Sequence, residues 1–203
     1  MSEPVSVAVI RTGTANIASI LAGLARAGAA PQVTEDARDV AAAGRVVLPG
    51  VGTFGAAMER VVADRLAAPL RERIAAGRPT LCICVGLQLL AEESEESPGV
   101  PGLAVVPGRV ERFSAPGLRV PQLGWNRVVA DPGCRVLAEG HAYFANSYRL
   151  AAAPPGWLAA RADYGGPFVA GLERDAVLAC QFHPELSGAF GLGVLRRWLE
   201  AAC

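Results

Sequence analysis

The stretch Leu81-Cys82-Ile83-Cys84-Val85-Gly86 is the junction on which the expected fold depends. Residues 80–83 form a short apolar run typical of a buried strand, and a helix-like stretch over residues 85–93 follows directly. Cysteine at such a junction, with glycine two residues later, is typical of an elbow that exposes a nucleophile at the edge of a sheet. Cys84 is therefore a candidate nucleophile, although the hexapeptide alone also fits a small buried cysteine.

The same order of strand and helix occurs twice before this junction. Residues 5–10 are apolar and β-branched, and they lead through Gly13 into an amphipathic stretch over residues 16–27. Residues 45–48 are followed by helical stretches to about residue 76. Short buried strands that alternate with helices favour a parallel sheet. We therefore expect an α/β fold with an open, largely parallel sheet flanked by helices.

The second half of the chain has a different texture from about residue 98 onward. Short β-like segments separated by proline and glycine cover residues 109–113, 128–129, 143–150, 157–162, 168–172 and 176–182. An amphipathic helix over residues 193–202 closes the chain. We expect an antiparallel addition to the sheet in this half. No linker divides the chain, so residues 1–203 are expected to form one domain.

Composition and charge exclude several classes of function. The chain is 52% apolar and carries 19 basic and 19 acidic residues, which leaves no electrostatic footprint for nucleic acid or for an anionic membrane. Small neutral substrates or protein partners are favoured instead. The amino terminus lacks the pattern of a secretory signal, and no apolar run reaches the roughly 20 residues that a bilayer span requires. We expect a cytosolic protein.

The cysteine and histidine content argues against a disulfide framework and against a metal site. Five cysteines are an odd number, and a chain of this length does not need disulfides to fold, so free thiols are expected. Only two histidines are present, His141 and His183, and the cysteines lack paired spacing, so zinc has poor support. No cofactor is expected. His141 is interpreted as a surface or turn residue.

A base for the candidate nucleophile lies in residues 181–185, Gln-Phe-His-Pro-Glu, directly after an apolar strand. Proline restricts the preceding residue to extended backbone, so the side chains of His183 and Glu185 can project to the same side. The carboxylate could then hold one imidazole tautomer and orient the ring toward sulfur. The tripeptide alone is a weak signal, but together with Cys84 it indicates nucleophilic catalysis.

A glycine-rich loop follows another strand at residues 48–55, Leu-Pro-Gly-Val-Gly-Thr-Phe-Gly. Small side chains leave its backbone N–H groups open, so the loop could supply a second oxyanion donor or could cradle a phosphate. The phosphate-binding Walker motif needs a lysine, and the chain contains none. ATP hydrolysis is therefore disfavoured.

These three pieces together resemble the class I glutamine amidotransferases: a Pro-Gly-Val-Gly oxyanion loop, Cys-x-Gly-x-Gln after a strand, and a late Phe-His-Pro-Glu. Further segments resemble one subfamily, the glutaminase subunit of imidazole glycerol phosphate synthase in histidine biosynthesis, over nearly the whole chain. These segments are residues 89–96, 98–103, 120–126 and 143–148. The resemblance implies a flavodoxin-like fold.

The resemblance also implies a role for each candidate residue. Cys84 would be the nucleophile, His183 the general base and then acid, and Glu185 the orienting carboxylate, so that L-glutamine is cleaved through a thioester to glutamate and ammonia. The implied oxyanion donors are the N–H groups of Val51 or Gly52 and of Val85. The implied contacts to the amino-acid head of the substrate are Gln88 and Glu96, with Asn146 and Ser147 as helpers. Without the resemblance, the acidic run over residues 92–96 would be read as a solvated helix end.

A partner is implied because ammonia released into neutral water is mostly protonated and no longer nucleophilic. The resemblance implies a (β/α)8 cyclase subunit that takes up the ammonia through a protected path and forms a heterodimer with this chain. Trp125 is expected near that interface or beneath it, with packing in the core as the alternative.

The chain departs from the subfamily pattern at a few positions. Cys82 stands two positions before the nucleophile in place of the usual glycine, and Asn146 replaces a frequent histidine. Arg11 and Ala15 change the first loop, and Leu186 replaces the lysine that usually follows His-Pro-Glu. None of these changes touches the three catalytic candidates. The changes at Arg11, Ala15 and Leu186 put partner docking in doubt, because the family turns those segments toward its cyclase.

Two alternatives remain open at this point. A glutaminase of the same class could serve another synthase, such as that for pyridoxal phosphate, although residues 98–103 and 120–126 favour histidine biosynthesis. A non-catalytic regulatory subunit could retain the fold only to bind a synthase. Against it, a protein without catalysis has no physical need for a cysteine at an elbow beside a histidine base.

Overall fold

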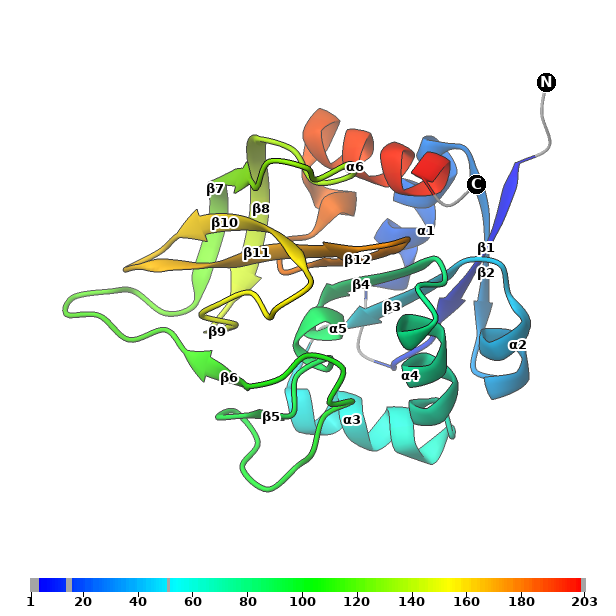
Figure 1. Ribbon diagram of the computed structural model, residues 1–203, viewed down its shortest axis with the longest axis horizontal. Coiled ribbons are helices and arrows are strands. Elements are labelled where there is room, and N and C mark those ends of the chain that lie inside the picture. Colours follow the sequence, from blue (N-terminus) through cyan, green and yellow to red (C-terminus); the bar gives the residue numbers. More distant parts are fainter. Residues whose placement is uncertain (1–3, 14–15, 51, 202–203) are drawn as a thin grey trace.

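The centre of the computed structural model, which describes residues 4–13, 16–50 and 52–201, is a nine-stranded sheet (Figure 1). Its strand order is β2-β1-β3-β4-β12-β11-β10-β7-β8. The strands that pair in parallel are β1 (Val5–Ile10), β2 (Ala29–Thr34), β3 (Val46–Gly50), β4 (Thr80–Cys84) and β12 (Val177–Cys180). β3 and β4 pair from Val46 opposite Thr80 to Gly50 opposite Cys84, so the two strands end level. The expected parallel sheet is confirmed.

The second half of the chain adds the antiparallel strands that its sequence predicts. They are β7 (Gln122–Ala130), β8 (Gly140–Asn146), β10 (Leu158–Asp163) and β11 (Pro167–Arg174). A separate small sheet consists of β5 (Glu93–Ser94), β6 (Arg109–Arg112) and β9 (Tyr148–Arg149). In the nine-stranded sheet, the second half of the described chain contributes one parallel strand, β12, which lies beside β4.

The antiparallel strands curl, so that the outermost strand β8 meets the chain that follows β12. The carbonyl group of Tyr143 accepts from the N–H of His183 at 3.0 Å, and the N–H of Tyr143 donates to Ser187 Oγ at 2.9 Å. Inside the curl, the buried rings of Phe113, Phe144, Phe168 and Phe182 meet edge to face. This aromatic core holds the segment that carries His183 against β8.

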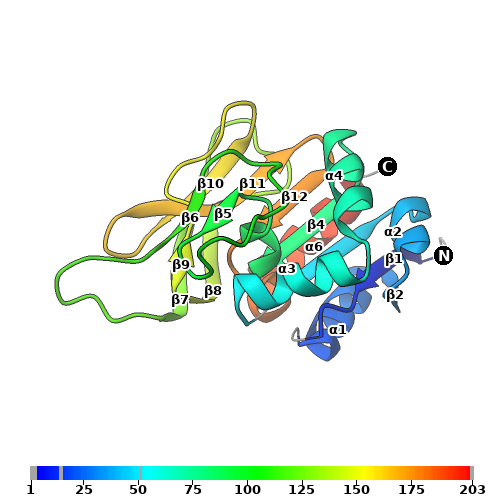
Figure 2. The same ribbon diagram turned by 90° about the horizontal axis from the view of Figure 1, so that it is seen from below.

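Helices cover both faces of the parallel part (Figure 2). On one face lie α1 (Ile17–Ala27) and α6 (Gly188–Ala201), and on the other lie α3 (Phe54–Ala63) and α4 (Ala67–Ala75). α2 (Ala37–Ala42) packs against α4. α1 begins where the Asn16 side chain accepts from the N–H of Ser19, and it ends at Gly28, whose φ is 104°. These caps explain why the helix occupies the range expected from its amphipathic pattern.

The helix expected over residues 85–93 is wrong in length, because α5 (Val85–Gln88) ends five residues early. The carbonyl groups of Leu89 and Leu90 accept from the N–H groups of Leu103 and Val105, at 2.7 and 2.8 Å, rather than from a further helical turn. The acidic run is likewise not a helix end. Its carboxylates bind backbone N–H groups of distant loops and strands, including Gly108 and Arg112.

Two elements between residues 29 and 42 were absent from the sequence prediction, and the last helix begins earlier than predicted. β2 contains Pro31 and lies at the edge of the sheet, where proline is tolerated but masks a strand pattern. α2 has only six residues, too few to show a helical period. α6 begins at Gly188 rather than at residue 193, because the glycines that suggest a turn lie within its first turns.

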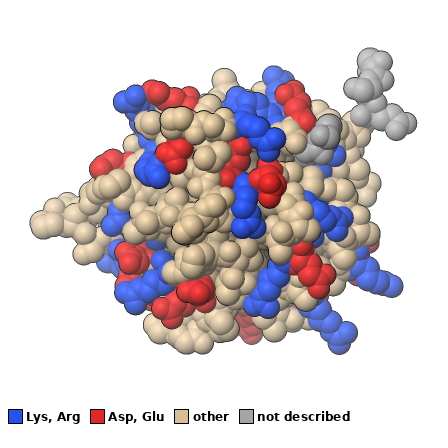
Figure 3. All heavy atoms as spheres, viewed as in Figure 1, with Lys and Arg blue, Asp and Glu red and all other residues tan. Residues whose placement is uncertain are grey.

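Charge is mixed over the surface, as the composition indicates. Figure 3 shows acidic and basic side chains interspersed over the face that it presents. The ion pairs among the described residues are mostly exposed, such as Arg38 with Asp36 and Arg127 with Glu139. Among the residues described, no helix combines the length and the hydropathy needed to cross a bilayer.

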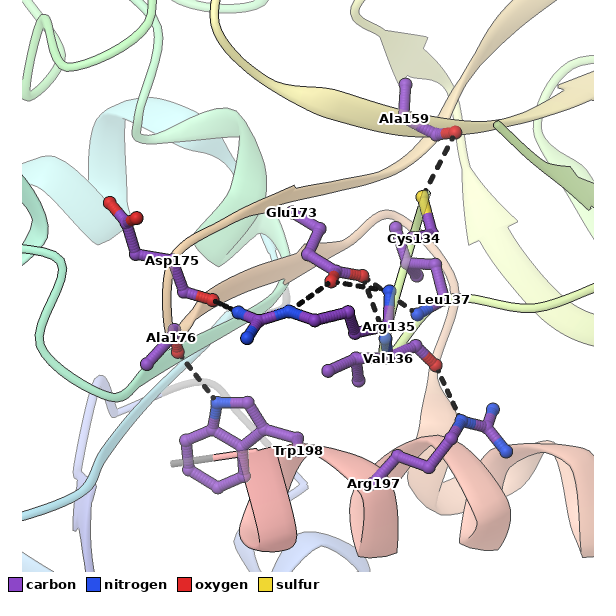
Figure 4. A network of polar contacts seen from close by, with 10 residues as sticks. All are labelled: Cys134, Arg135, Val136, Leu137, Ala159, Glu173, Asp175, Ala176, Arg197 and Trp198. Carbon is purple, nitrogen blue, oxygen red and sulfur yellow. Dashed lines mark hydrogen bonds and ion pairs between the residues drawn. The ribbon is translucent and has the colours of Figure 1, made fainter. Parts of the chain in front are cut away.

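A buried carboxylate fixes the connection between β7 and β8 (Figure 4). Glu173, on β11, accepts three backbone hydrogen bonds in this connection. The donors are the N–H groups of Arg135, Val136 and Leu137, at 2.8, 3.0 and 3.0 Å. From α6, Arg197 Nε donates to the carbonyl of Val136 at 2.8 Å. The antiparallel half is therefore tied both to the sheet and to the last helix.

A buried arginine ties the helical layer to the parallel strands. Arg73, on α4, is 1% exposed, and its guanidinium donates to four backbone carbonyl groups. The acceptors are those of Val40, Ala43, Gly44 and Pro79, at 3.0, 2.7, 3.4 and 2.9 Å. Burial, together with the nearby cation of Arg78, lowers the pKa of Arg73 to about 10. Arg73 thus joins the end of α2 to the start of β4.

Replacement of Arg73 should lower the stability of the fold substantially. In Arg73→Met the apolar stem remains but buried carbonyl groups lose their donors, so the free energy of unfolding should fall by about 3 kcal/mol. Arg78→Met is the matched control, because Arg78 is half-buried and donates to the carbonyl groups of Ala41 and Ala43 from the same side. Its loss should stay near about 1 kcal/mol. Urea unfolding measures both, and equal losses would contradict a special role for Arg73.

Candidate active site

The junction quoted first in the sequence is a strained elbow. Cys84 ends β4 with φ 55° and ψ −110°, a left-handed conformation that a residue with a side chain rarely adopts. Two glycines allow the neighbouring strand to approach the turn. A Cβ on Gly86 would overlap the carbonyl oxygen of Leu48, and a Cβ on Gly50 would lie 2.8 Å from the Gly86 nitrogen. The elbow therefore depends on both glycines.

Cys84 lies in a pocket of about 320 Å³ at the carboxyl end of β3 and β4. Residues from both halves of the chain line it: Gly52, Cys84, Val85, Gln88, Glu96, Pro121, Leu123, Ala145, Asn146, Ser147, Tyr148 and His183. This set includes the site residues that the sequence predicts, except two. Glu185 lies behind His183, and Val51 lies outside the described residues.

His183 and Glu185 form a buried pair beside the cysteine. His183 Nδ1 lies 2.9 Å from Glu185 Oε1, and the two side chains are 7% and 3% exposed. Burial disfavours the imidazolium, but hydrogen bonds to Cys84 and to Glu185 outweigh it and raise the pKa of His183 to about 10. Because Nδ1 faces the carboxylate, Nε2 is the nitrogen left for the sulfur. A protonated imidazole that is hydrogen-bonded to the sulfur stabilises a thiolate.

Helix α1 braces the carboxylate from behind. A Cβ on Gly23 would lie 3.0 Å from the Cβ of Glu185, so glycine allows α1 to contact the short helix η1 (Pro184–Leu186). Ser187 Oγ donates to the carbonyl of His183 at 2.6 Å and closes the turn. These contacts hold the pair in one orientation before any substrate binds.

The predicted oxyanion donors are only partly described. Gly52 lines the pocket with φ 91°, which glycine adopts without strain. Val85 is the first residue of α5, so its N–H has no partner within that helix. The two residues border the same pocket as Cys84.

The predicted substrate contacts are engaged in hydrogen bonds to the protein. Gln88 Nε2 donates to the carbonyl of Tyr148 at 3.1 Å, and Asn146 Nδ2 donates to the same oxygen at 3.0 Å. Glu96 Oε2 accepts from the N–H of Phe54 at 2.7 Å, at the start of α3. All three side chains border the pocket, as does Ser147.

One residue beside Cys84 was not assigned from the sequence. Gln181 is fully buried, and its Nε2 lies 3.7 Å from Cys84 Sγ. Its Oε1 accepts from Gln88 Nε2 at 3.0 Å. The available signal was its place two positions before His183 at the end of a strand, where alternate residues share a face.

The arrangement agrees with comparison to known proteins. Residues 9–200 match the sequence profile of the family described as "Glutamine amidotransferase class-I". The chain belongs to this family. The expectation drawn from the resemblance is therefore confirmed at the level of the family.

Curated relatives of this amidotransferase are similar over nearly their whole length. The imidazole glycerol phosphate synthase subunit HisH of Methanothermobacter thermautotrophicus is 43% identical over 197 residues, which cover 96% of this chain and 98% of that protein. The subunit of the same name from Deinococcus radiodurans is 44% identical over 188 residues, covering 90% and 87%. The expected subfamily is thereby confirmed.

Solved structures confirm the expected fold of this amidotransferase. A crystal structure of a glutamine amidotransferase superposes with a TM-score of 0.77 at 22% identity, covering 97% of this chain and 98% of the other. The structure of PurLQS from Thermotoga maritima superposes with a TM-score of 0.70 at 16% identity, covering 97% and 98%. At these identities the likeness concerns the fold alone.

The residues at which this amidotransferase departs from the subfamily pattern differ in burial. Cys82 is fully buried, as strand alternation indicates, and burial raises the pKa of its thiol to about 12. Arg11 pairs with Glu35 at 3.2 Å on the surface, and Leu186 is 41% exposed. Ala15 lies outside the described residues.

The thiols should differ sharply in reactivity. Burial raises the pKa of Cys82, Cys134 and Cys180, whereas Cys84 lies beside a histidine that stays protonated to about pH 10. Iodoacetamide should therefore label Cys84 first at neutral pH, because the protonated imidazole favours the reactive thiolate. In His183→Asn, labelling of Cys84 at the same pH should be slower. Peptide mass spectrometry measures this in a Cys203→Ser background, and faster labelling of Cys134 would contradict it.

Proposed function

We propose that this chain hydrolyses L-glutamine to glutamate and ammonia through a thioester on Cys84. The ammonia is then delivered to a cyclase subunit of imidazole glycerol phosphate synthase in histidine biosynthesis. The observation that carries the proposal is the strained elbow of Cys84 beside the buried pair of His183 and Glu185. The names of the relatives support the pathway.

In the first half of the reaction the thiolate of Cys84 attacks the amide carbon of glutamine. The oxyanion receives N–H groups from Val85 and from the loop at Gly52, or from Val51 next to it. His183 gives its Nε2 proton to the departing nitrogen, so ammonia leaves and the acyl group remains on sulfur. Glu185 holds the ring through Nδ1 during this transfer.

In the second half a water molecule attacks the thioester. His183 is now neutral and takes a proton from that water, and the carbon–sulfur bond breaks to give glutamate and the thiolate. The protonated histidine is restored for the next cycle. No atom other than those of glutamine and water is consumed, which is why the reaction needs no cofactor.

The pocket suits the amino-acid head of glutamine. Gln88 uses both N–H bonds of Nε2 within the protein, so its Oε1 remains as an acceptor. An acceptor and the carboxylate of Glu96 together favour a ligand with an ammonium group. Asn146 and Ser147 border the same end of the pocket. These four residues are proposed to bind the head of the substrate.

An apolar patch at the mouth of the pocket is proposed as the docking surface for the cyclase. The Trp125 patch consists of Leu123, Trp125 and Leu186, which are 67%, 58% and 41% exposed. Leu123 also lines the pocket, and the ring of Trp125 meets that of Tyr143 at 6.3 Å. The exposure of Trp125 shows that the alternative of core packing is wrong. A partner seated here would cover the point where ammonia leaves.

The proposed setting follows from the thiol chemistry. A nucleophilic cysteine must stay reduced, which favours the cytoplasm. The cysteines Cys82, Cys84, Cys134 and Cys180 are free thiols. Because the pocket takes residues from both halves of the chain, residues 1–203 are proposed to act as one amidotransferase domain in a heterodimer with the (β/α)8 cyclase.

Loss of the nucleophile should separate the two activities of the assembled synthase. Cys84→Ala should abolish glutamine-dependent synthesis, because no thioester can form, while synthesis supplied with ammonium salts continues at the wild-type rate. Product formation by the complex measures both. Loss of both activities would mean that Cys84 is structural, and retention of both would favour a non-catalytic role for the chain.

A charge within the Trp125 patch should weaken the complex without harming the catalytic site. Trp125→Glu should raise the dissociation constant for the cyclase at least about tenfold, because burial of a carboxylate replaces burial of a large apolar ring. Val62→Glu is the control, since Val62 is 61% exposed near the end of α3. Titration calorimetry measures both variants, with labelling of Cys84 as the check on the site. An unchanged constant for Trp125→Glu would move the interface elsewhere.

A further inference from the structure

Three amide and carbonyl groups form a continuous chain from the wall of the pocket to the sulfur of Cys84. The carbonyl of Tyr148 accepts from Gln88 Nε2 at 3.1 Å. The same nitrogen donates to Gln181 Oε1 at 3.0 Å, and Gln181 Nε2 points its own donor at Cys84 Sγ, 3.7 Å away. Gln88 and Gln181 are 3% and 0% exposed, so water does not compete for these bonds.

The direction of each hydrogen bond in this row follows from the carbonyl group of Tyr148 at its start. A backbone carbonyl can only accept, so the amide nitrogen of Gln88 must face Tyr148. Its second N–H then meets the side chain of Gln181, which must present oxygen there and nitrogen to the sulfur. A reversed amide would bring two acceptors or two donors together inside the protein, which is costly without water. Asn146 Nδ2 also donates to the carbonyl of Tyr148 and fixes that acceptor further.

We infer that Gln181 is a positioning residue for the nucleophile, which holds the sulfur of Cys84 as a thiolate through an N–H bond whose direction Gln88 imposes. The inference rests on the proposed role of Cys84. A sulfur that accepts from both His183 and Gln181 is fixed in one rotamer as well as charged. Gln181 can serve in this way because its own backbone N–H is anchored to the carbonyl of Ala170 at 2.8 Å, at the end of β12.

This row of hydrogen bonds also joins the proposed nucleophile to Gln88, which is proposed to bind the substrate. A ligand that accepts a hydrogen bond from Gln88, or that displaces it from Tyr148, must loosen the bond between Gln88 and Gln181. A ligand that donates to Gln88 Oε1 leaves the hydrogen bonds from Gln88 through Gln181 to the sulfur intact, and it strengthens them by polarising the Gln88 amide. The site is therefore set to favour a substrate whose head is an ammonium group over an isosteric one that lacks it.

The test needs a measured quantity that would stay unchanged if Gln181 had only a structural role. The titratable groups that border the pocket of Cys84 are Glu96, Tyr148 and His183, with Glu185 behind His183. Gln181 carries no charge at any pH, so its contribution appears only as a shift in the ionisation of the sulfur. The pH midpoint of alkylation of Cys84 by iodoacetamide, in the full chain with Cys203→Ser, reports that ionisation without partner or substrate.

Two variants of Gln181 keep the size of the side chain but change what it offers to the sulfur. Gln181→Met removes the donor and should raise the midpoint by about one pH unit, the usual effect of one lost hydrogen bond to a charged group. Gln181→Glu keeps the shape but places a carboxylate beside the sulfur, so its midpoint should rise further. The matched control is Gln122→Met, because Gln122 is likewise a buried glutamine, 3% exposed, but does not line the pocket. Its midpoint should equal that of the parent protein.

Each outcome decides between the two claims. An ordinary thiol profile for Cys84 in the parent protein would refute the proposed catalytic role of Cys84, whatever the variants do. A low midpoint in the parent that is unchanged in both folded variants would overturn the inference about Gln181 and leave the catalytic role standing. If circular dichroism shows that both variants unfold while Gln122→Met folds, Gln181 is a core residue and the inference also fails.

Discussion

The structure depends on the close approach of two parallel strands at the point where one of them turns. β3 and β4 end level, and the turn at Cys84 holds a left-handed backbone that costs on the order of 1 to 3 kcal/mol. That cost is offset because Gly50 and Gly86 let the strand end and the turn pack without side chains between them. The result is a sulfur at the end of the strand and the start of a short helix, next to the N–H of Val85, which has no partner within that helix. Every later element of the site is placed relative to this turn.

His183, the proposed base, reaches the turn because the antiparallel half curls back. His183 follows the one parallel strand that the second half contributes, and its backbone is bonded to Tyr143 on the outermost strand. Glu173 and the aromatic core hold that curl from inside, whereas α1 braces Glu185 from outside. The pair of His183 and Glu185 and the pocket walls thus come from the folding of the whole chain rather than from any local motif. A lesion in the distant β7–β8 connection should therefore reach the site through β8.

Local pattern was sufficient for much of the fold and for the three catalytic candidates, because each follows from a short stretch. The apolar runs and their following helices predict the parallel part, and the residue types around Cys84 and His183 predict an elbow and a base. Local sequence pattern did not predict those features that depend on hydrogen bonds between residues far apart in the sequence. α5 stops at Gln88 because the carbonyl groups of the next two residues, Leu89 and Leu90, accept from a later segment instead of continuing the helix. β2 is masked by Pro31 at an edge. The direction of the Gln88 amide, and with it Gln181, depends on a carbonyl 60 residues away.

The central claim is that glutamine is cleaved through a covalent bond to Cys84, and direct observation of that bond is the sharpest test. The complex with the proposed cyclase partner and its ribotide ligand would be mixed with less than one equivalent of glutamine and quenched in acid within the first turnover. Its intact mass would then be measured. The account predicts a transient adduct with the mass of glutamine less ammonia, mapped to the peptide that contains Cys84, which decays as glutamate appears. Release of glutamate at the same rate with no adduct at any time, or an adduct on another residue, would contradict it.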